Sequence, residues 1–174
     1  MTDISPLRAA SGRISFRAED RTRHAVDRVM TLPPQVLASI FTRFDAARTM
    51  DDAKALDADL TRWQQPLAGL LVSIKDLFDE AGLTTTAGSA ILSGAPVARE
   101  DAEAVRRLKA AGAIAFGRTT MSEFAYSGVG LNPHFGNPQN ALGPRRITGG
   151  STSGGAVTVA LGLADVALGS DTGG

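Results

Sequence analysis

The chain has 174 residues, of which 43% are hydrophobic, and this is enough apolar material to bury a core. Lys plus Arg and Asp plus Glu both number 18, so the formal net charge is zero and provides no field that would attract nucleic acid or an anionic membrane. The absence of cysteine excludes disulfides, thiolate catalysis and cysteine-based metal sites.

Signals for a membrane, an export route or a cofactor are sparse. The sequence contains no run of about eighteen apolar residues, so no transmembrane helix is predicted. The N-terminus lacks the apolar region of a secretory signal. We therefore expect a cytoplasmic protein without membrane contact. His24 and His134 lie far apart in the sequence and lack the spacing of metal ligands. The sequence predicts neither a metal site nor a cofactor.

Residues 1–64 are predicted to form a helical N-terminal extension. Three helices are expected there: residues 18–30, a helix that begins after Pro33 and Pro34, and residues 50–64. The first is polar enough to lie on the surface. The other two carry apolar stripes at helical spacing, which we interpret as core contacts rather than as a binding site. The stripes comprise Val36, Leu37, Ile40, Phe41 and Phe44, and then Ala53, Leu56, Leu60 and Trp63.

Residues 65–174 alternate between strand and helix patterns and are predicted to belong to one domain. Asp101 is a candidate N-cap for the first helix of this part, and Gly112 closes that helix. Strand, crossover helix and strand in succession predict an α/β fold, a sheet with helices on its faces. The expected strands are residues 67–76, 113–117 and 165–169, and the expected helices are residues 102–112 and 154–164.

Two loops near the end of the chain combine glycine with hydroxyl side chains. They read GGSTSGGA at 149–156 and GSDTGG at 169–174. Neither loop has the lysine of a phosphate-binding P-loop, a GxGxxG fingerprint or a GxSxG nucleophile elbow. A Ser-His-Asp arrangement would require the fold to bring in His24 or His134, and no motif supports it. Glycine at this density indicates backbone that approaches something closely.

A lysine remains as the candidate base for a hydroxyl. Lys75 ends an apolar run, and burial there would favour the neutral amine that a base requires. The alternative is that Lys75 reaches solvent from the strand end and pairs with Asp76 or Asp79. The local pattern by itself favours this alternative.

Three segments together resemble the amidase signature family. Residues 149–174 resemble its defining motif, in which a glycine-serine loop, a helix and a strand lead to a D-T-G-G-S turn. VSIKDLFD, at 72–79, resembles the family's lysine segment, and residues 101–138 resemble the stretch between the two sites. The resemblance covers residue 65 to the end, and the order and spacing of the motifs make it specific.

The resemblance implies a fold and a catalytic triad. Members of the family use a Ser-Ser-Lys triad in a mixed β-sheet surrounded by helices. Lys75 matches their catalytic lysine, and Ser151 matches their bridging serine, whose preceding peptide bond is cis. Their nucleophile is the serine directly after D-T-G-G, which here would be residue 175 and is not among the 174 residues.

The resemblance also implies contacts with the substrate. The backbone N–H groups of Thr172, Gly173 and Gly174 would point at the oxyanion of the tetrahedral intermediate. Ala125, in the segment MSEFAYS, is expected to line the acyl pocket, and Ser151 is expected to contact the substrate.

The remaining hydroxyl groups have weaker assignments. Thr152 and Ser153 are expected to hold the loop or to cap the following helix. The family pattern places Ser170 in the approach to the turn rather than at the nucleophile. Thr120 stands where many members carry asparagine, a departure that affects a local hydrogen bond and not the triad.

The function implied is hydrolysis of a small-molecule amide through an acyl-enzyme, without a cofactor. Because members of the family run to several hundred residues, we expect this chain to be the N-terminal part of one signature domain and to be inactive alone. Two alternatives stay open: the glutaminase subunit of a tRNA-dependent amidotransferase, and a non-catalytic module that binds an anion at the glycine loop. Neither the oligomeric state nor the particular amide can be inferred from these residues.

Overall fold

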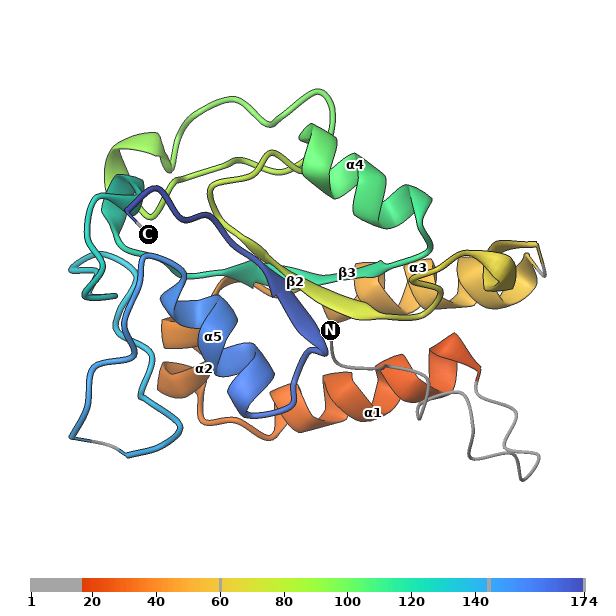
Figure 1. Cartoon of the computed structure of the whole chain (residues 1–174), viewed down its shortest axis with the longest axis horizontal. Helices are drawn as coiled ribbons and strands as arrows, with labels where there is room; N and C mark the ends of the chain where they lie inside the picture. The colour runs from red at the N-terminus through yellow and green to blue at the C-terminus, as the bar shows by residue number, and fades with distance from the viewer. Residues whose placement is uncertain (1–16, 60, 144, 174) are drawn as a thin grey trace.

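A central β-sheet organises the chain. The computed structural model describes residues 17–173 except 60 and 144. Within these residues the sheet has four strands in the order β1-β3-β2-β4 (Figure 1). Strands β2 (Leu71–Lys75), β3 (Ile114–Thr119) and β4 (Val166–Leu168) are parallel, whereas β1 (Phe41–Arg43) pairs antiparallel with β3 at one edge. This mixed sheet flanked by helices confirms the predicted α/β fold.

Five α-helices and three short 3₁₀ helices surround the sheet in the described part of the chain. None of these helices is both long enough and apolar enough to span a membrane. The α-helices are α1 (Ala18–Met30), α2 (Pro34–Ile40), α3 (Ala46–Ala58), α4 (Glu103–Ala110) and α5 (Ser153–Ala160), and the 3₁₀ helices are η2 (Arg62–Gln64), η3 (Ala90–Leu92) and η4 (Glu123–Ala125).

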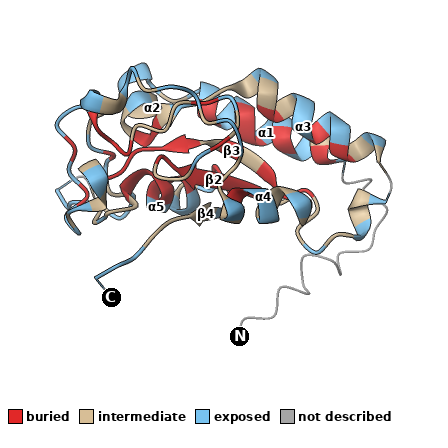
Figure 2. Ribbon diagram, turned by 90° about the horizontal axis from the view of Figure 1, so that it is seen from above, coloured by how far each residue is buried: buried red, intermediate tan, exposed pale blue. Residues whose placement is uncertain are grey.

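The helices cover the two faces of the sheet unequally. In Figure 1, α4 lies above the sheet, whereas α1, α2 and α5 lie below it. The larger core cluster joins the lower face to α1, α2, α3 and α5, and the smaller one joins the upper face to α4. Figure 2 shows the buried residues concentrated on the strands and on the helix sides that face them. Side chains alternate along β2, so Leu71 and Ser73 face α5, and Val72 and Ile74 face α4.

The second predicted helix is shorter than its apolar stripe indicated. Helix α2 ends at Ile40, and Phe41 begins β1, so the expectation that Phe41 and Phe44 continue the helix is wrong. Tertiary packing explains the difference, because the two rings contact each other and Phe44 also stacks edge-on against Phe116 of β3. The stripe is a core contact, as expected, but a strand and a loop provide part of it.

Three helix ends also differ from the sequence-based expectation. Asp101 does not cap α4: Ala102 occupies the N-cap, and the Asp101 carboxylate instead accepts from the Ala81 amide at 2.8 Å and pairs with Lys109 at 3.0 Å. The third predicted helix begins earlier, at Ala46, where the Asp45 carboxylate accepts from the Arg48 amide. It ends at Ala58, which leaves Trp63 in η2, and Leu60 lies outside the described residues.

A β-bulge interrupts β3 at Gly117. Val72 pairs with Ala115 and Ile74 with Arg118, so β3 has one more residue than β2 in this interval. Gly117 has a φ of +76°, and a Cβ on it would lie 2.8 Å from the Phe41 ring, so both conformation and space require glycine. The extra residue reverses the alternation: Phe116 lies in the lower core, whereas Arg118 turns to the upper face.

Candidate active site

A groove lies at the carboxyl ends of β2 and β4. It has a volume of about 570 Å³ and is lined mainly by the two glycine loops that the sequence singled out, at residues 148–152 and 169–171. The carboxyl edge of parallel strands is where α/β proteins usually bind their ligands. The fold therefore brings the two loops together beside the last residue of β2.

Lys75 is that last residue, and it is fully buried, at 0% exposure. Its Nζ lies 2.7 Å from Ser151 Oγ and 2.8 Å from Ser170 Oγ. Burial lowers the pKa of Lys75, whereas the negative charge of Asp171 acts in the opposite direction. The alternative in which Lys75 reaches solvent is wrong, because β2 carries its side chain under the glycine loops.

Close backbone packing fixes the conformation of the loop that carries Ser151. The peptide bond between Gly150 and Ser151 is cis. The Gly150 amide donates to the Gly128 carbonyl at 2.8 Å, and the Ser151 carbonyl accepts from the Ser122 amide at 3.0 Å. A Cβ at Gly150 would lie 2.7 Å from Gly130 Cα, which leaves no room for a side chain. Two backbone segments thus meet at this point through glycine.

Ser170 contributes more to the site than the sequence indicated. Besides its hydroxyl, its backbone carbonyl lies 3.5 Å from Lys75 Nζ. The sequence signal was present, since Ser170 directly follows the glycine that ends the third predicted strand. Which serine of the segment would meet the lysine could not be inferred without the relative positions of β2 and β4.

Thr152 and Ser153 hold the loop rather than cap α5. Thr152 occupies the N-cap without a side-chain hydrogen bond to the helix, and its side chain packs where a Cβ on Gly169 would be. Ser153 is buried, and its hydroxyl lies 3.5 Å from the Thr120 carbonyl. The Thr120 hydroxyl donates to the Ser39 carbonyl at 2.7 Å, so this departure from the family's asparagine ties β3 to α2.

The segment assigned to the oxyanion hole is exposed. The Gly173 amide donates to the Asp171 carboxylate at 3.0 Å, and Thr172 is also exposed to solvent. Gly174 lies outside the described residues. The oxyanion role of Thr172, Gly173 and Gly174 therefore stays a prediction.

Ala125 lies in a segment that supports the Ser151 loop. It is the last residue of η4 and has a φ of +55°, directly after Phe124 with a φ of +51°. Its amide donates to the carbonyl of Ser122, the residue that holds the Ser151 carbonyl. Contact between Ala125 and the substrate stays a prediction.

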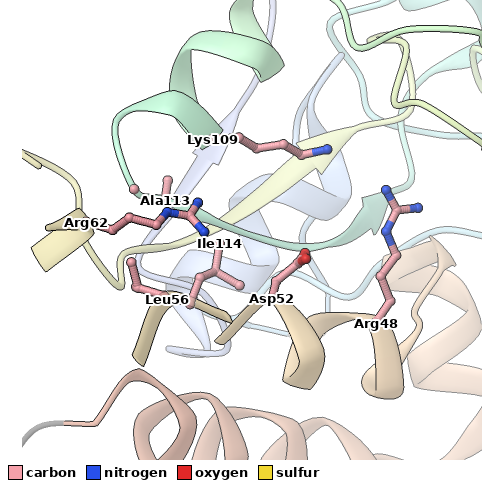
Figure 3. A pocket seen from close by; sticks show the side chains of 8 residues that line it. Arg48, Asp52, Leu56, Arg62, Lys109, Ala113 and Ile114 are labelled. Carbon is pink, nitrogen blue, oxygen red and sulfur yellow. The ribbon is translucent and has the colours of Figure 1, made fainter. Parts of the chain in front are cut away.

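A second, smaller cavity has no residues suited to acyl transfer. It has a volume of about 110 Å³ and lies between α3, the end of α4 and the start of β3 (Figure 3). Burial raises the pKa of Asp52, which faces it, whereas the positive charge of Arg48 acts in the opposite direction. Its lining contains no hydroxyl or imidazole group, so it lacks the serine and the histidine of the common acyl-transfer sites. The lining residues are Arg48, Asp52, Leu56, Arg62, Lys109, Gly112, Ala113 and Ile114.

Neither histidine joins the groove. His134 Nε2 lies 3.4 Å from Glu123 Oε1, and His24 lies in α1. Across the described ranges, no group of three or more His, Cys, Asp or Glu side chains is placed to hold a metal ion.

The chain is similar to known proteins in both sequence and fold. The family model described as Amidase matches residues 20–174. The AtzE subunit of the 1-carboxybiuret hydrolase from Pseudomonas sp. (strain ADP) is 44% identical over 140 residues, which cover 79% of this chain and 31% of that protein. One glutamyl-tRNA(Gln) amidotransferase subunit of Nitratidesulfovibrio vulgaris (strain DP4) is 39% identical over 171 residues, 98% of this chain and 34% of that protein.

Solved structures share the fold. One, described as "An unexpected vestigial protein complex reveals the evolutionary origins of an s-triazine catabolic enzyme", has a TM-score of 0.83 and 40% identity, covering 90% of this chain and 34% of that chain. Native peptide amidase from Stenotrophomonas maltophilia has a TM-score of 0.80 and 29% identity, covering 95% of this chain and 35% of that chain. The chain thus spans about a third of the length of these relatives. Together, the family model, the identities and the shared fold show that this chain belongs to the amidase signature family.

Proposed function

We propose that this chain supplies the lysine base and the bridging serine of an amide hydrolase that acts on a small-molecule amide. The observation that carries the proposal is the 2.7 Å contact between the buried Lys75 amine and the Ser151 hydroxyl at the edge of an open groove. A base and a hydroxyl within hydrogen-bond distance are the recognisable parts of an activated nucleophile.

Lys75 Nζ lies within hydrogen-bond distance of three oxygens, Ser151 Oγ and the hydroxyl and carbonyl of Ser170, and these can accept the three N–H groups of an ammonium. Proton transfer requires the neutral amine. Such an amine has two N–H groups and one lone pair. The hydroxyl and the carbonyl of Ser170 can accept the two N–H groups, which leaves the lone pair for the Ser151 hydroxyl proton. Ser170 is therefore a positioning residue in this proposal, because it orients Lys75 toward Ser151.

Proton transfer then proceeds in two linked steps. Lys75 takes a proton from Ser151 while Ser151 takes one from the nucleophile, and the nucleophile oxygen attacks the amide carbonyl carbon. The reverse relay protonates the leaving amine, and water later releases the acid from the acyl-enzyme. We propose a serine directly after Gly174 as the nucleophile. Inactivity of residues 1–174 alone stays a prediction.

Activity is expected to rise with pH, because the base acts only as a neutral amine. Burial lowers the pKa of Lys75, so the midpoint of the rise in kcat/KM should lie below the 10.5 of an ordinary lysine. Asp171→Asn removes a negative charge that raises this pKa and should move the midpoint to lower pH. The profile is measured with an anilide substrate on a full-length protein that carries this chain. Asp51→Asn, on the exposed side of α3, is the control and should leave the midpoint in place.

Removing the Ser151 hydroxyl is expected to reduce turnover by roughly 10²–10⁴-fold, the usual contribution of one proton-transfer step. Ser151→Ala should also slow the labelling of the nucleophile by a fluorophosphonate, because the relay from Lys75 is broken. Ser93→Ala removes an exposed hydroxyl that does not line the groove and is the matched control. Unchanged labelling of Ser151→Ala, in a protein that unfolds at the same temperature, would contradict the relay.

Similarity to an amidotransferase component over 98% of the chain favours a second candidate function. In that case the amide would be glutamine, and the ammonia released would pass to a partner protein. Co-purification and a glutaminase assay separate the two functions. A protein that hydrolyses simple amides alone is a free-standing amidase, whereas release of ammonia from glutamine only with a co-purified partner indicates the amidotransferase function.

A further inference from the structure

The residue that follows Lys75 takes part in a buried ion pair. Asp76 is 1% exposed and Arg118 is 2% exposed. Arg118 donates from Nε at 2.9 Å and from Nη2 at 2.6 Å to the same carboxylate oxygen of Asp76. Because side chains alternate along a strand, this pair lies on the face of the sheet opposite to the Lys75 amine. None of the steps proposed above uses it.

The Asp76 carboxylate is held firmly in that position. Its second oxygen accepts the hydroxyl of Thr86. Its backbone is fixed as well, because the Asp76 amide donates to the Thr119 carbonyl at 3.1 Å and its carbonyl accepts from the Ala87 amide at 2.8 Å. These hydrogen bonds and the pairing with Arg118 hold the carboxylate in one position. The negative charge of this ion pair thus lies one residue from Lys75 in the sequence.

That charge would oppose the work of a lysine base. A carboxylate nearby favours the ammonium form of lysine, which cannot accept a proton. Arg118 places a compensating positive charge beside the same carboxylate. With Arg118 in place, burial of Lys75 can act without a counteracting field from Asp76.

We propose that Arg118 is a positioning residue for the Lys75 base: it holds and neutralises Asp76 so that the Lys75 amine, on the opposite face of the sheet, keeps its proton-accepting form. This role rests on the proposed function of Lys75 in proton transfer. The Gly117 bulge is what makes the pairing possible, because it turns Arg118 to the face on which Asp76 lies.

The other groups around Lys75 do not compensate the negative charge of Asp76. On the Lys75 face, Ser151 and Ser170 are uncharged, and helix α5 contains no charged residue. Asp171, after β4, is an exposed carboxylate whose charge favours the ammonium form. Glu123, in η4, is held by the Ser89 hydroxyl and lies 3.4 Å from His134.

On the opposite face, Arg118 has one further acidic neighbour. Its Nη1 lies 3.7 Å from Glu80 Oε2. Glu80 in turn pairs with Arg48 at 3.2 Å and with Lys109 at 3.4 Å. Figure 3 shows these two cations on α3 and α4, beside the smaller cavity. Glu80 therefore has cations of its own, and Arg118 is the cation that hydrogen-bonds Asp76.

The proposal is tested by titrating Lys75 directly. Residues 1–174 contain three lysines, Lys54, Lys75 and Lys109. Their ε-carbon signals are followed by NMR in a full-length protein that carries this chain and is labelled at lysine. Lys75 is assigned by the signal that is lost in Lys75→Met, and Lys54, which is exposed, is the internal reference. The variants are Asp76→Asn, Arg118→Gln and the double variant. Arg107→Gln, which removes a cation from an exposed pair on α4, is the control.

The two single variants should move the Lys75 midpoint in opposite directions. Arg118→Gln leaves Asp76 uncompensated and should shift it to higher pH, whereas Asp76→Asn leaves Arg118 uncompensated and should shift it to lower pH. Each shift should exceed the spread of the Lys54 midpoints. The double variant should return to the wild-type midpoint, and Arg107→Gln should not move it. Shifts in the same direction, or no shift, would overturn the proposal.

The design remains decisive when a variant is unstable. Breaking a buried ion pair is destabilising, and Arg118→Gln is the variant that should lose the most stability. Asp76→Asn keeps an amide oxygen for Arg118 and an amide group for Thr86, so it should disturb the fold less. The proposal therefore requires that Asp76→Asn alone shift the Lys75 midpoint to lower pH. The titration does not depend on turnover. A protein that shows the opposed shifts but hydrolyses no amide would refute the proposed function and leave the charge balance intact. When activity is present, the midpoint of the pH profile of kcat/KM should move with the Lys75 midpoint measured by NMR.

Discussion

Replacing Lys75 with methionine is expected to reduce amide hydrolysis by about 10³-fold or more while leaving the free energy of unfolding undiminished. Methionine matches the length of the stem but has no proton acceptor, so both proton transfers through Ser151 stop. The residual rate would come from substrate binding and oxyanion stabilisation. The measurement is kcat/KM of the variant in a full-length protein that carries this chain.

Stability separates a catalytic Lys75 from a structural one. Because burial lowers the pKa of Lys75 below its unfolded value, the unfolded state binds the proton more readily, and the folded state loses stability as pH falls below 10.5. This cost is absent in Lys75→Met. The variant should therefore be at least as stable as wild type at neutral pH, and any advantage should shrink toward pH 10.5.

Lys54→Met is the matched control, since Lys54 is exposed on α3 and pairs with the exposed Asp51 at 3.2 Å. It should change neither rate nor stability appreciably. If Lys75→Met retained most of the activity, or if it lost activity only because it unfolded, the assignment of Lys75 as the base would be refuted.

Adding one methyl group at Gly154 is expected to destabilise the protein by roughly 2–3 kcal/mol and to reduce turnover on the order of 10²-fold. A Cβ there would lie 2.4 Å from the Ile40 carbonyl and 2.6 Å from Thr120 Oγ1. The Gly154 amide also donates to the Thr120 carbonyl at 3.0 Å, so the first turn of α5 sits directly against β3. Gly154→Ala must push α5 away, and the Ser151 loop moves with it.

Denaturant unfolding and kcat/KM together check this prediction. Gly94→Ala and Gly143→Ala are the controls, because neither glycine has a left-handed φ and an added Cβ at either would meet no atom within 4 Å. Both should be neutral or slightly stabilising. Wild-type stability in Gly154→Ala would mean that α5 is not held as closely as its contacts indicate.

The fold was largely predictable because its strands and helices alternate in a βαβ pattern with clear apolar runs. The three parallel strands and α5 lie where the sequence predicted them to within a few residues. Strand β1 was not predictable, because its three residues continue a helical stripe, and only pairing with β3 separates them from the helix. The cap of α4 was mistaken for a similar reason. Asp101 has a suitable side chain, but Lys109 and the Ala81 amide compete for it.

The site was predictable only in part. The two glycine loops and Lys75 could be named from the sequence, but local residues favoured an exposed lysine. Burial of Lys75 depends on the position of α5 and its loop over β2, which no local pattern contains. The roles of Ser170 and Arg118 depend on strand order and on a bulge, and these are properties of the assembled sheet.

Because of the bulge at Gly117, the number of residues in β3 decides which face of the sheet each later side chain occupies. Deleting one residue from β3 would turn Arg118 downward into the apolar layer that holds Phe116, and Asp76 would be buried without its cation. A strand tolerates substitutions at most of its positions. A change of its length here would move every following side chain of β3 to the opposite face of the sheet. Evolution of this sheet should therefore permit new side chains around Gly117 far more readily than insertions or deletions.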